Sequence, residues 1–314
     1  MRAFVAGGAG FIGSHTVARL LGEPLVSAVT VYDNFSSGSL DHLPSNVGDR
    51  LRVVKADLSA LGELCEAMAG HDVVFHYASN PDIARAATEP DIDFWQGTYL
   101  TQNILEAMRR TGVGRIVYAS GSGVYGDTGL TELKEDYAPL LPISTYGASK
   151  LAGEALICSY CSMFGLQAWV FRFANVVGAR QTHGVGFDFL RRLRVDPSQL
   201  LILGDGTQSK HYIHVSDILN GIWLARQRAT GHYNYFNLAT DDGITVTQIA
   251  EMVISIMGLG NVVLKYTGGD RGWKGDIPLV RMDTSKIKAL GWRARLSTGQ
   301  ALEASIRDMY DEAR

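Results

Sequence analysis

Short apolar runs rich in β-branched residues alternate with longer amphipathic stretches through the first half of the chain. The short runs, which are typical of strands, are Ala3–Ala6, Val29–Tyr32, Arg52–Lys55, Val73–His76, Arg115–Ala119 and Ala168–Phe173. The longer stretches, which are typical of helices, are Ile12–Leu21, Leu61–Ala69, Glu89–Thr111 and Ser144–Phe164. Strands that are apolar throughout are buried on both faces, and helical crossovers join parallel neighbours. The pattern therefore predicts an α/β fold with a doubly wound parallel sheet covered by helices.

The rhythm breaks after about residue 175 into glycine-rich loops, short strands and isolated helices. Two segments are predicted as loops by their glycine content, Leu203–Gln208 and Gly268–Gly275. We expect a first domain over residues 1–174 and a smaller lobe over residues 175–314, some segments of which return to the first domain. A chain of 314 residues is long enough for two such lobes that share one cleft.

Charge and cysteine content exclude several classes of protein. The formal net charge is -3, so there is no basic field to hold nucleic acid or an anionic membrane. The chain opens with a strand-like run instead of a signal peptide, and no apolar run approaches the ~20 residues that a membrane span needs. We therefore expect a soluble, cytoplasmic protein. Three cysteines make no disulfide framework, and Cys158 and Cys161 are predicted as two buried helix thiols without a metal.

Three glycines stand between the first predicted strand and the first predicted helix, in Gly7-Gly-Ala-Gly-Phe-Ile-Gly13. Gly7 allows a tight turn, Gly10 lets the backbone approach a pyrophosphate, and Gly13 lets the helix pack closely on the sheet. The N-terminus of that helix offers unpaired N–H groups to a phosphate. A glycine motif alone is weak, but here a strand and a helix stand on the correct sides of it. The first domain is therefore predicted to be a Rossmann-type dinucleotide-binding domain.

Acidic residues end the second and third predicted strands. Asp33 lies ~20 residues beyond the glycines, where a carboxylate binds the hydroxyls of an adenosine ribose. That carboxylate would repel a 2′-phosphate, so the sequence favours NAD over NADP. Asp57 suits either a contact with the adenine amine or a helix N-cap, and the sequence does not choose between them.

Tyr146 and Lys150 lie four residues apart in Tyr-Gly-Ala-Ser-Lys and therefore on one face of a predicted helix. A phenol with its ordinary pKa near ~10 is a poor base at neutral pH. A lysine ammonium beside it, together with a positive nicotinamide ring, would favour the phenolate. Tyr146 could then remove a sugar hydroxyl proton while hydride leaves the same carbon, and Lys150 would also bind the nicotinamide ribose.

With these motifs in place, the chain resembles an extended short-chain dehydrogenase/reductase of the NAD-dependent epimerase/dehydratase family. It is most similar to the short UDP-glucose 4-epimerases of that family. The motifs that carry the resemblance span nearly the whole chain: Gly7–Gly13, Asp33–Gly38, Val74–Ser79, Val124–Asp127, Tyr146–Lys150, Arg172–Gly178 and Gly204–Gln208.

The resemblance implies a set of site residues. Those at the NAD cofactor would be Gly7, Gly10, Phe11, Ile12, Gly13, Asp33, Asn34, Ser36, Ser37, Gly38, Asp57, Leu58, Tyr77, Ala78, Ser79, Tyr146, Lys150 and Phe173. Those at a nucleotide-sugar substrate would be Ser79, Asn80, Arg85, Ser122, Tyr146, Asn175, Gly204, Gln208, Lys210, Tyr212, Arg271 and Asp276. Asn175 would lie near the phosphates, and Lys210 and Arg271 would bracket the diphosphate or its ribose. No metal is implied.

Three positions depart from the family pattern. Relatives usually place a Ser or Thr where this chain has Gly121, and that hydroxyl bonds the reacting sugar oxygen. Ser120 and Ser122 flank the glycine; either could stand in for it, and the sequence does not choose between them. Gly97 stands where relatives usually have an Asn that helps to position cofactor and loop, and Lys210 replaces an Arg and loses its planar fork.

The same loop separates the sister activities of the family. Dehydratases and decarboxylases carry a Glu two residues before the tyrosine of this loop, whereas this chain has Ser122 and Gly123. The resemblance therefore favours 4-epimerisation of UDP-glucose/UDP-galactose through a transient 4-keto sugar. Alternatives are a UDP-N-acetylhexosamine or UDP-uronic acid epimerase, a net nucleotide-sugar oxidoreductase, or a non-catalytic NAD sensor. A uronate would want a further cation, for which Arg85 and Arg180 are candidates.

A homodimer is a further expectation from the family. Relatives commonly dimerise through the helices that correspond here to Glu89–Thr111 and Ser144–Phe164. Apolar residues on two faces of the second stretch permit such an interface and fit burial within one chain equally well; they are Leu151, Ala155, Leu156, Tyr160, Met163 and Phe164.

Overall fold

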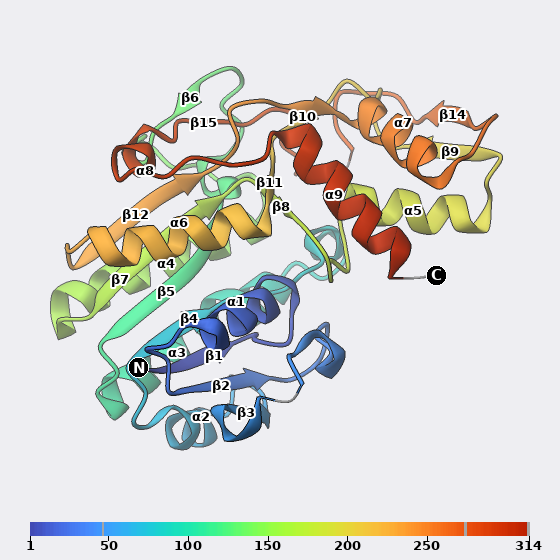
Figure 1. The fold of residues 1–314 in the computed structure, drawn as a ribbon. Helices are drawn as coiled ribbons and strands as arrows, with labels where there is room; N and C mark the ends of the chain where they lie inside the picture. Colours follow the sequence, from blue (N-terminus) through green and yellow to red (C-terminus); the bar gives the residue numbers. More distant parts are fainter. Residues whose placement is uncertain (46, 273–274, 313–314) are drawn as a thin grey trace.

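The computed structural model describes residues 1–45, 47–272 and 275–312. Its centre is a seven-stranded parallel sheet with the strand order β12-β7-β5-β4-β1-β2-β3 (Figure 1). The strands are β1 (Arg2–Ala6), β2 (Ala28–Asp33), β3 (Leu51–Lys55), β4 (Val73–His76), β5 (Arg115–Gly121), β7 (Gln167–Phe173) and β12 (Tyr233–Leu238). Each of the predicted strands is present, and the predicted α/β class with a doubly wound parallel sheet is confirmed.

Helices cover both faces of this sheet. They are α1 (Phe11–Gly22), α2 (Leu61–Met68), α3 (Leu100–Thr111), α4 (Thr145–Phe164) and α6 (Val215–Arg228). On one face, Val17 of α1 joins Val5 of β1 in an apolar core that also receives α6. On the other face, Leu64 of α2 joins Phe4 of the same strand in a core shared with α3 and α4. Neighbouring residues of β1 thus enter opposite cores, which is why the strand reads as apolar throughout rather than alternating.

The chain returns to the sheet after leaving it. β12 pairs in parallel with β7 and forms the edge of the sheet, although it lies in the second half of the sequence. The crossover helix α6 packs against the core that contains α1. The sheet is therefore completed by a segment beyond residue 175.

The second lobe has its own apolar core and several short strand pairs. Its helices are α5 (Val185–Val195), α7 (Val246–Met257) and α9 (Thr298–Asp311), whereas α8 (Ser285–Ala289) packs against β12 and places Ile287 in the core that contains α1. The short strands of the second half are β8 (Asn175–Val177), β9 (Gln199–Ile202), β10 (Ser209–Lys210), β11 (Tyr212–His214), β13 (Ile244–Thr245), β14 (Val263–Tyr266) and β15 (Arg281–Met282). One further short strand, β6 (Glu132–Leu133), belongs to the first half of the chain. Figure 1 shows α5, α7, α9, β9 and β14 gathered on one side of the sheet domain. Trp273 and Lys274 of the predicted 268–275 loop lie outside the described residues.

The structure corrects two predictions. The stretch Glu89–Thr111 is not one α-helix from end to end, because a π-helical segment, Phe94–Tyr99, precedes α3. The second correction is that Cys158 is exposed, so only Cys161 of the predicted pair is a buried thiol. Among the described residues, no helix is both long and apolar enough to cross a membrane.

Candidate active site

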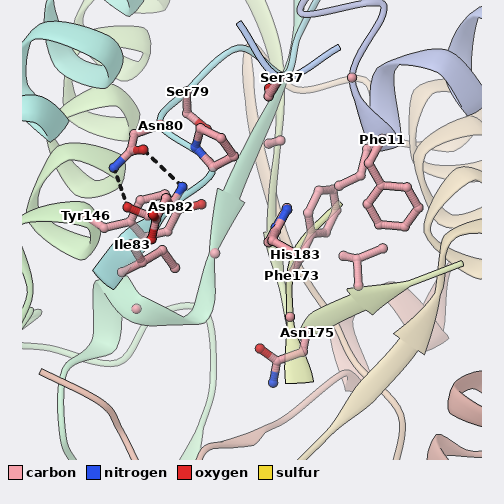
Figure 2. A pocket seen from close by; sticks show the side chains of 18 of the residues that line it. Phe11, Ser37, Ser79, Asn80, Asp82, Ile83, Tyr146, Phe173, Asn175 and His183 are labelled. Carbon is pink, nitrogen blue, oxygen red and sulfur yellow. Dashed lines mark hydrogen bonds between the residues drawn. The ribbon is translucent and has the colours of Figure 1, made fainter. Parts of the chain in front are cut away.

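A cavity of about 890 Å³ lies at the carboxyl ends of the sheet strands and is lined by residues of both halves of the chain. Figure 2 shows Ser79, Asn80 and Tyr146 on one side of it and Phe11 on the other. Every residue assigned to the cofactor by resemblance lines this cavity except Gly38, and so do Ser120 and Ser122. Of the residues assigned to the substrate, Arg85, Gly204 and Arg271 do not line it. Residues far apart in the sequence thus share one site.

The glycine turn has the geometry that a pyrophosphate requires. Gly7 has a φ of +73°, and a Cβ there would lie 2.7 Å from the backbone nitrogen of Ala78. A Cβ on Gly13 would lie 2.1 Å from the carbonyl oxygen of Gly7. At Gly10, by contrast, a Cβ would meet only that oxygen, at 3.4 Å, because this residue borders the cavity. Gly10 caps α1 without a side-chain hydrogen bond, so the first N–H groups of α1 are free to bind an anion.

The two acids expected at the adenosine are fixed by backbone and side-chain donors. Asp33 accepts from the backbone N–H groups of Ala9, at 2.9 Å, and Phe35, at 2.8 Å. Asp57 accepts from Ser59 N, at 2.9 Å, and from the side-chain amide of Asn34, at 2.8 Å. Hydrogen bonds from Ser59, with that from Asn34, lower the pKa of Asp57 although partial burial opposes them. Asp57 does not cap α2, because the N-cap of that helix is residue 60. Of the two roles expected for Asp57, this leaves the contact with the adenine amine. A dinucleotide without a 2′-phosphate fits this end of the cavity.

Tyr146 and Lys150 lie one turn apart on α4 and both line the cavity. The Nζ of Lys150 donates to the carbonyl oxygen of Ala119 at 2.9 Å and lies 5.5 Å from the centre of the Tyr146 ring. Burial lowers the pKa of Lys150 to about 8, and the carboxylate of Asp93 opposes this shift. Burial raises the pKa of Tyr146 to about 12, Asp93 adds to the rise, and the hydroxyl of Ser79 counters it. The protein alone therefore keeps Tyr146 as a phenol at neutral pH, because desolvation and the Asp93 carboxylate outweigh the hydrogen bond with Ser79.

Asp93 is a buried carboxylate that sequence reasoning missed. It is 1% exposed, and it accepts from the amide of Asn80 at 3.0 Å and from the hydroxyl of Thr145 at 2.7 Å. Thr145 is the first residue of α4, and Asn80 borders the cavity. Asp93 therefore ties the start of the helix that carries Tyr146 to the cavity wall. No local signal distinguished it, because the stretch 89–111 also contains Glu89, Asp91 and Glu106.

Gly97 allows a close approach between the π-helical segment and α4. A Cβ at Gly97 would lie 2.2 Å from the Oγ of Ser149. That hydroxyl donates to the backbone oxygen of Asp93 at 2.7 Å. A side chain at position 97 would displace the Ser149 hydroxyl, so the close packing of the two helical segments requires a glycine here.

The two serines that flank Gly121 have different surroundings. The Oγ of Ser120 donates to the carboxylate of Glu154 at 2.5 Å and is buried. The Ser122 hydroxyl lines the cavity and makes no hydrogen bond with any other described residue. A Cβ at Gly121 would meet only the backbone oxygen of Phe173, at 4.0 Å, so packing does not require a glycine there. Ser122 is thus the hydroxyl that is free to bind a ligand.

Two cations of the second lobe that were predicted at the substrate, Lys210 and Arg271, are already paired. Lys210 forms an ion pair with Asp276, which is 4% exposed. The guanidinium of Arg271 donates to the carboxylate of Asp127 at 2.5 Å and to the backbone oxygen of Asp276 at 2.6 Å. The buried Oε1 of Gln208, which lines the cavity, has no hydrogen-bond partner among the described residues. An anion that enters here must exchange partners with carboxylates, and a donor on the ligand can satisfy Gln208.

Pairing of two short strands brings further predicted residues together. β8 and β11 run in parallel with Asn175 opposite Tyr212. Both side chains belong to the cavity lining, and the Asn175 amide donates to the backbone oxygen of His211 at 3.3 Å. The sequence separates Asn175 and Tyr212 by a helix and a loop, yet the substrate side of the cavity presents them side by side.

Besides Arg271, four predicted residues lie away from the cavity for identifiable reasons. Arg85 bonds Glu89 through its side chain at 2.9 Å and is about half exposed. Arg180, the other candidate cation for a uronate, donates to a hydroxyl on α1. Gly38 lies against Ala9, behind the glycine turn. Gly204 has a φ of +83° and leaves room for the amide of Gln208, so its contribution is to the loop rather than to the lining.

Several lining residues carried no motif. They come mainly from the loop before α5 and from α5 itself: Gln181, Thr182, His183, Asp188 and Arg192. Figure 2 shows His183 among the side chains that line the cavity. A short loop that follows a strand of the sheet was the only sequence signal for these residues, and it does not say which way the loop folds.

Fold and site together define a dinucleotide-binding enzyme of the short-chain dehydrogenase/reductase class, with a tyrosine and a lysine at the reacting end of the cavity. The model of the NAD dependent epimerase/dehydratase family matches residues 3–239. The chain belongs to that family.

Curated relatives and solved structures agree with this assignment. The UDP-glucose 4-epimerase of Corynebacterium glutamicum is 30% identical over 82% of this chain and 81% of its own length. The UDP-glucose 4-epimerase of Thermotoga maritima, solved with UDP-glucose, has a TM-score of 0.89 and 28% identity over the full length of both chains. The UDP-glucose 4-epimerase of Thermus thermophilus, solved with NAD, has a TM-score of 0.86 and 29% identity over 99% of both chains.

Proposed function

We propose that this chain is an NAD-dependent 4-epimerase of a nucleotide sugar, with UDP-glucose and UDP-galactose as its first candidate substrates. The observation that carries the proposal is the position of Tyr146 and Lys150. Both face one cavity whose lining also includes the glycine turn before α1 and Lys210 of the second lobe. A relative that carries the same fold over its full length is a UDP-glucose 4-epimerase bound to UDP-glucose.

The first half of the chain would hold NAD. The N-terminus of α1 at Gly10 would bind the pyrophosphate, Asp33 the adenosine ribose and Asp57 the adenine. Lys150 would bind the nicotinamide ribose while keeping its bond to the backbone oxygen of Ala119. When bound, NAD supplies a hydride acceptor that returns the hydride within the same turnover.

Tyr146 would act as the general base towards the sugar hydroxyl at C4, and as the acid when the hydride returns. Burial holds Tyr146 as a phenol, so the tyrosine would need added positive charge beside it, of the kind a bound oxidised nicotinamide would supply, to remove the proton. Ser122 would bond the reacting oxygen in place of the residue missing at Gly121. Ser120 is already bonded to Glu154, and we assign it no contact with substrate.

The second lobe would bind the nucleotide diphosphate. Asn175, Gln208 and Tyr212 line that side of the cavity, and Lys210 lies beside them. Arg271 would reach the phosphates after leaving Asp127. We divide the chain functionally into residues 1–174 for NAD and residues 175–314 for the nucleotide sugar, apart from α6 and β12, which complete the sheet.

Epimerisation is favoured over the sister reactions. The loop after β5 has Ser122 and Gly123 where a dehydratase would carry an acid, so proton transfer at a neighbouring sugar carbon has no dedicated group. The uronate alternative loses support because Arg85 and Arg180 both lie outside the cavity lining. An N-acetylated sugar remains the second candidate substrate.

A homodimer through the α3–α4 face is part of this proposal. Large apolar side chains are exposed there, among them Phe94 at 52%, Trp95 at 53% and Met163 at 71%. Exposed apolar side chains such as these favour a protein partner, and an isologous contact would cover them on both copies. The cytoplasmic location expected from the sequence belongs to the proposal as well.

The test is incubation of the purified chain with UDP-glucose, UDP-galactose, their N-acetyl forms and UDP-glucuronate, followed by NMR of the products. Formation of the C4 epimer without added NAD(H) is the expected result. Tyr146→Phe should lower kcat by at least about 10³-fold and leave the amount of bound NAD unchanged. Absence of any epimer, or full turnover by Tyr146→Phe, would refute the proposal.

A further inference from the structure

A buried ion pair lies directly behind the end of β5. Arg172 of β7 and Glu154 of α4 are 4% and 3% exposed. The guanidinium binds both carboxylate oxygens, with Nη2 at 2.7 Å from Oε2 and Nε at 3.0 Å from Oε1. Taking both charges out of water costs several kcal/mol per ion unless the pair is well bonded. Stability alone does not explain such a pair, because apolar residues of similar volume often serve as well or better.

Glu154 continues the stripe of reacting residues on α4. Tyr146, Lys150 and Glu154 follow at intervals of four, so they lie on one face of the helix. Lys150 bonds the backbone oxygen of Ala119, and Glu154 accepts from the hydroxyl of the next residue, Ser120, at 2.5 Å. The helix thus holds β5 at two successive residues, immediately before Gly121.

Arg172 holds the other side of the same turn. Its Nη1 donates to the hydroxyl of Tyr125 and to the backbone oxygen of Glu135, both at 3.0 Å. Tyr125 in turn donates to the side chain of Asn237 at 2.7 Å. The 3₁₀ turn Ser122–Tyr125 is therefore bonded to the ion pair at its far end, as the strand before it is bonded at Ser120.

We propose that Glu154 and Arg172 are positioning residues of the reaction, which fix the turn that carries Ser122 relative to Tyr146 and Lys150. Neither needs to touch the substrate. The need is particular to this chain, because the hydroxyl would come from Ser122 and not from the usual position at Gly121. A turn with glycines on both sides of Ser122 has few backbone restraints of its own.

This proposal rests on the proposed function, since the hydroxyl and the phenol must meet one sugar oxygen. A misplacement of about 1 Å can cost on the order of 10²-fold in rate. The binding of NAD and of the nucleotide diphosphate involves other residues, so KM and cofactor content should not change.

The experiment uses two variants and one control. In Glu154→Met with Arg172→Met, both charges are removed together, so that no buried charge is left unpaired. Ser120→Ala removes only the bond between the strand and Glu154. Ser159→Ala is the control, since that hydroxyl belongs to the same helix, is exposed and bonds only the backbone oxygen of Leu156. Each protein is measured for Tm, bound NAD, kcat, KM, and hydrogen exchange of residues 119–126.

The expected result is a kcat lowered about 10- to 100-fold in the double variant and about 3- to 10-fold in Ser120→Ala. KM and bound NAD should match the wild type, and exchange of residues 119–126 should be faster. Unchanged kcat and unchanged exchange in Ser120→Ala would overturn the proposal, even if the double variant did not fold. A wild-type chain that forms no epimer would instead refute the proposed function, and the exchange measurement would still decide whether the ion pair holds the turn.

Discussion

Lys150 in the first half of the chain and Lys210 in the second half have partners of different charge. Lys150, in the first half, is buried with a neutral partner, the backbone oxygen of Ala119. Lys210, in the second half, forms an ion pair with the buried Asp276. Arg271 forms an ion pair with Asp127. Where the first half meets phosphate it offers backbone N–H groups at Gly10 and no cation.

This difference teaches what each half must do on binding. Backbone donors at a helix N-terminus are held in place by the fold, so a dinucleotide finds its site already formed. Cations that are paired with carboxylates must give up those partners before they can bind a diphosphate. We therefore expect substitutions in the first half to act on chemistry or on the fold, and substitutions in the second half to act mainly on KM.

The largest effect is expected for Lys150→Met. Loss of the ammonium beside Tyr146 should lower kcat by about 10³-fold. Burial lowers the pKa of Lys150 from 10.5 to about 8, so the buried charge disfavours the folded state below pH 8, and this cost disappears as pH rises towards 10.5. The variant should therefore be more stable than the wild type at pH 7, and the difference should narrow from pH 8 to 10.5. Thermal unfolding across that range checks the sign, and a variant that is less stable at pH 7 contradicts it.

Two matched variants of the glycine turn distinguish an effect on folding stability from an effect on NAD binding. Gly13→Ala places a Cβ 2.1 Å from a backbone oxygen and should destabilise the protein by about 3 kcal/mol or more. Gly10→Ala meets its nearest atom at 3.4 Å and should cost only about 1 kcal/mol. Its methyl group would instead obstruct the pyrophosphate, so NAD affinity should fall by about 10²-fold. Urea unfolding and NAD titration of both variants test these expectations. Normal NAD affinity in Gly10→Ala would mean that the pyrophosphate does not bind at this turn.

The ion pair between Arg271 of the second half and Asp127 of the first should give smaller effects, of opposite sign for its two residues. Arg271→Met should raise the KM for the nucleotide sugar about 10-fold with little change in kcat, because a phosphate contact is lost. Asp127→Asn should lower KM about 2-fold, because Arg271 no longer has to leave a carboxylate, and added salt should reduce the gain. The KM of both variants, measured by steady-state kinetics at two ionic strengths, tests these predictions. A higher KM in Asp127→Asn would mean that this carboxylate helps to bind the substrate.

The smallest effect is expected for Arg85→Ala. Arg85 is about half exposed, is paired with Glu89 and lies outside the cavity lining. An exposed pair of this kind contributes about 0–1 kcal/mol, so KM for UDP-glucose should change less than about 2-fold. A large rise in KM would mean that Arg85 contacts the substrate, and it would restore support for the uronate alternative.

Sequence reasoning worked best where one local signal implied one local geometry. Glycines between a strand and a helix, apolar runs of strand length and a Tyr–Lys spacing of four each describe a short piece of backbone. It did not reach contacts made at long range. Asp93 lies near Tyr146 only because the π-helical segment packs on α4, and the pairing of Arg271 with Asp127 joins two loops 144 positions apart.

The choice between the two serines illustrates the same limit. Ser120 and Ser122 look equivalent in the sequence, and both line the cavity. Glu154, a full 34 positions from Ser120, bonds that hydroxyl and leaves Ser122 free. The partner lies on another element, so no local pattern could have named it.

The sequence by itself determined the fold class, the dinucleotide half and the identity of the Tyr146–Lys150 pair, because these depend on periodicity and on spacing within one element. The tertiary structure alone decided which charges are paired, which serine is free and how the pKa of Tyr146 is raised. Those properties depend on burial and on distances between elements, and the packing of the whole chain sets both.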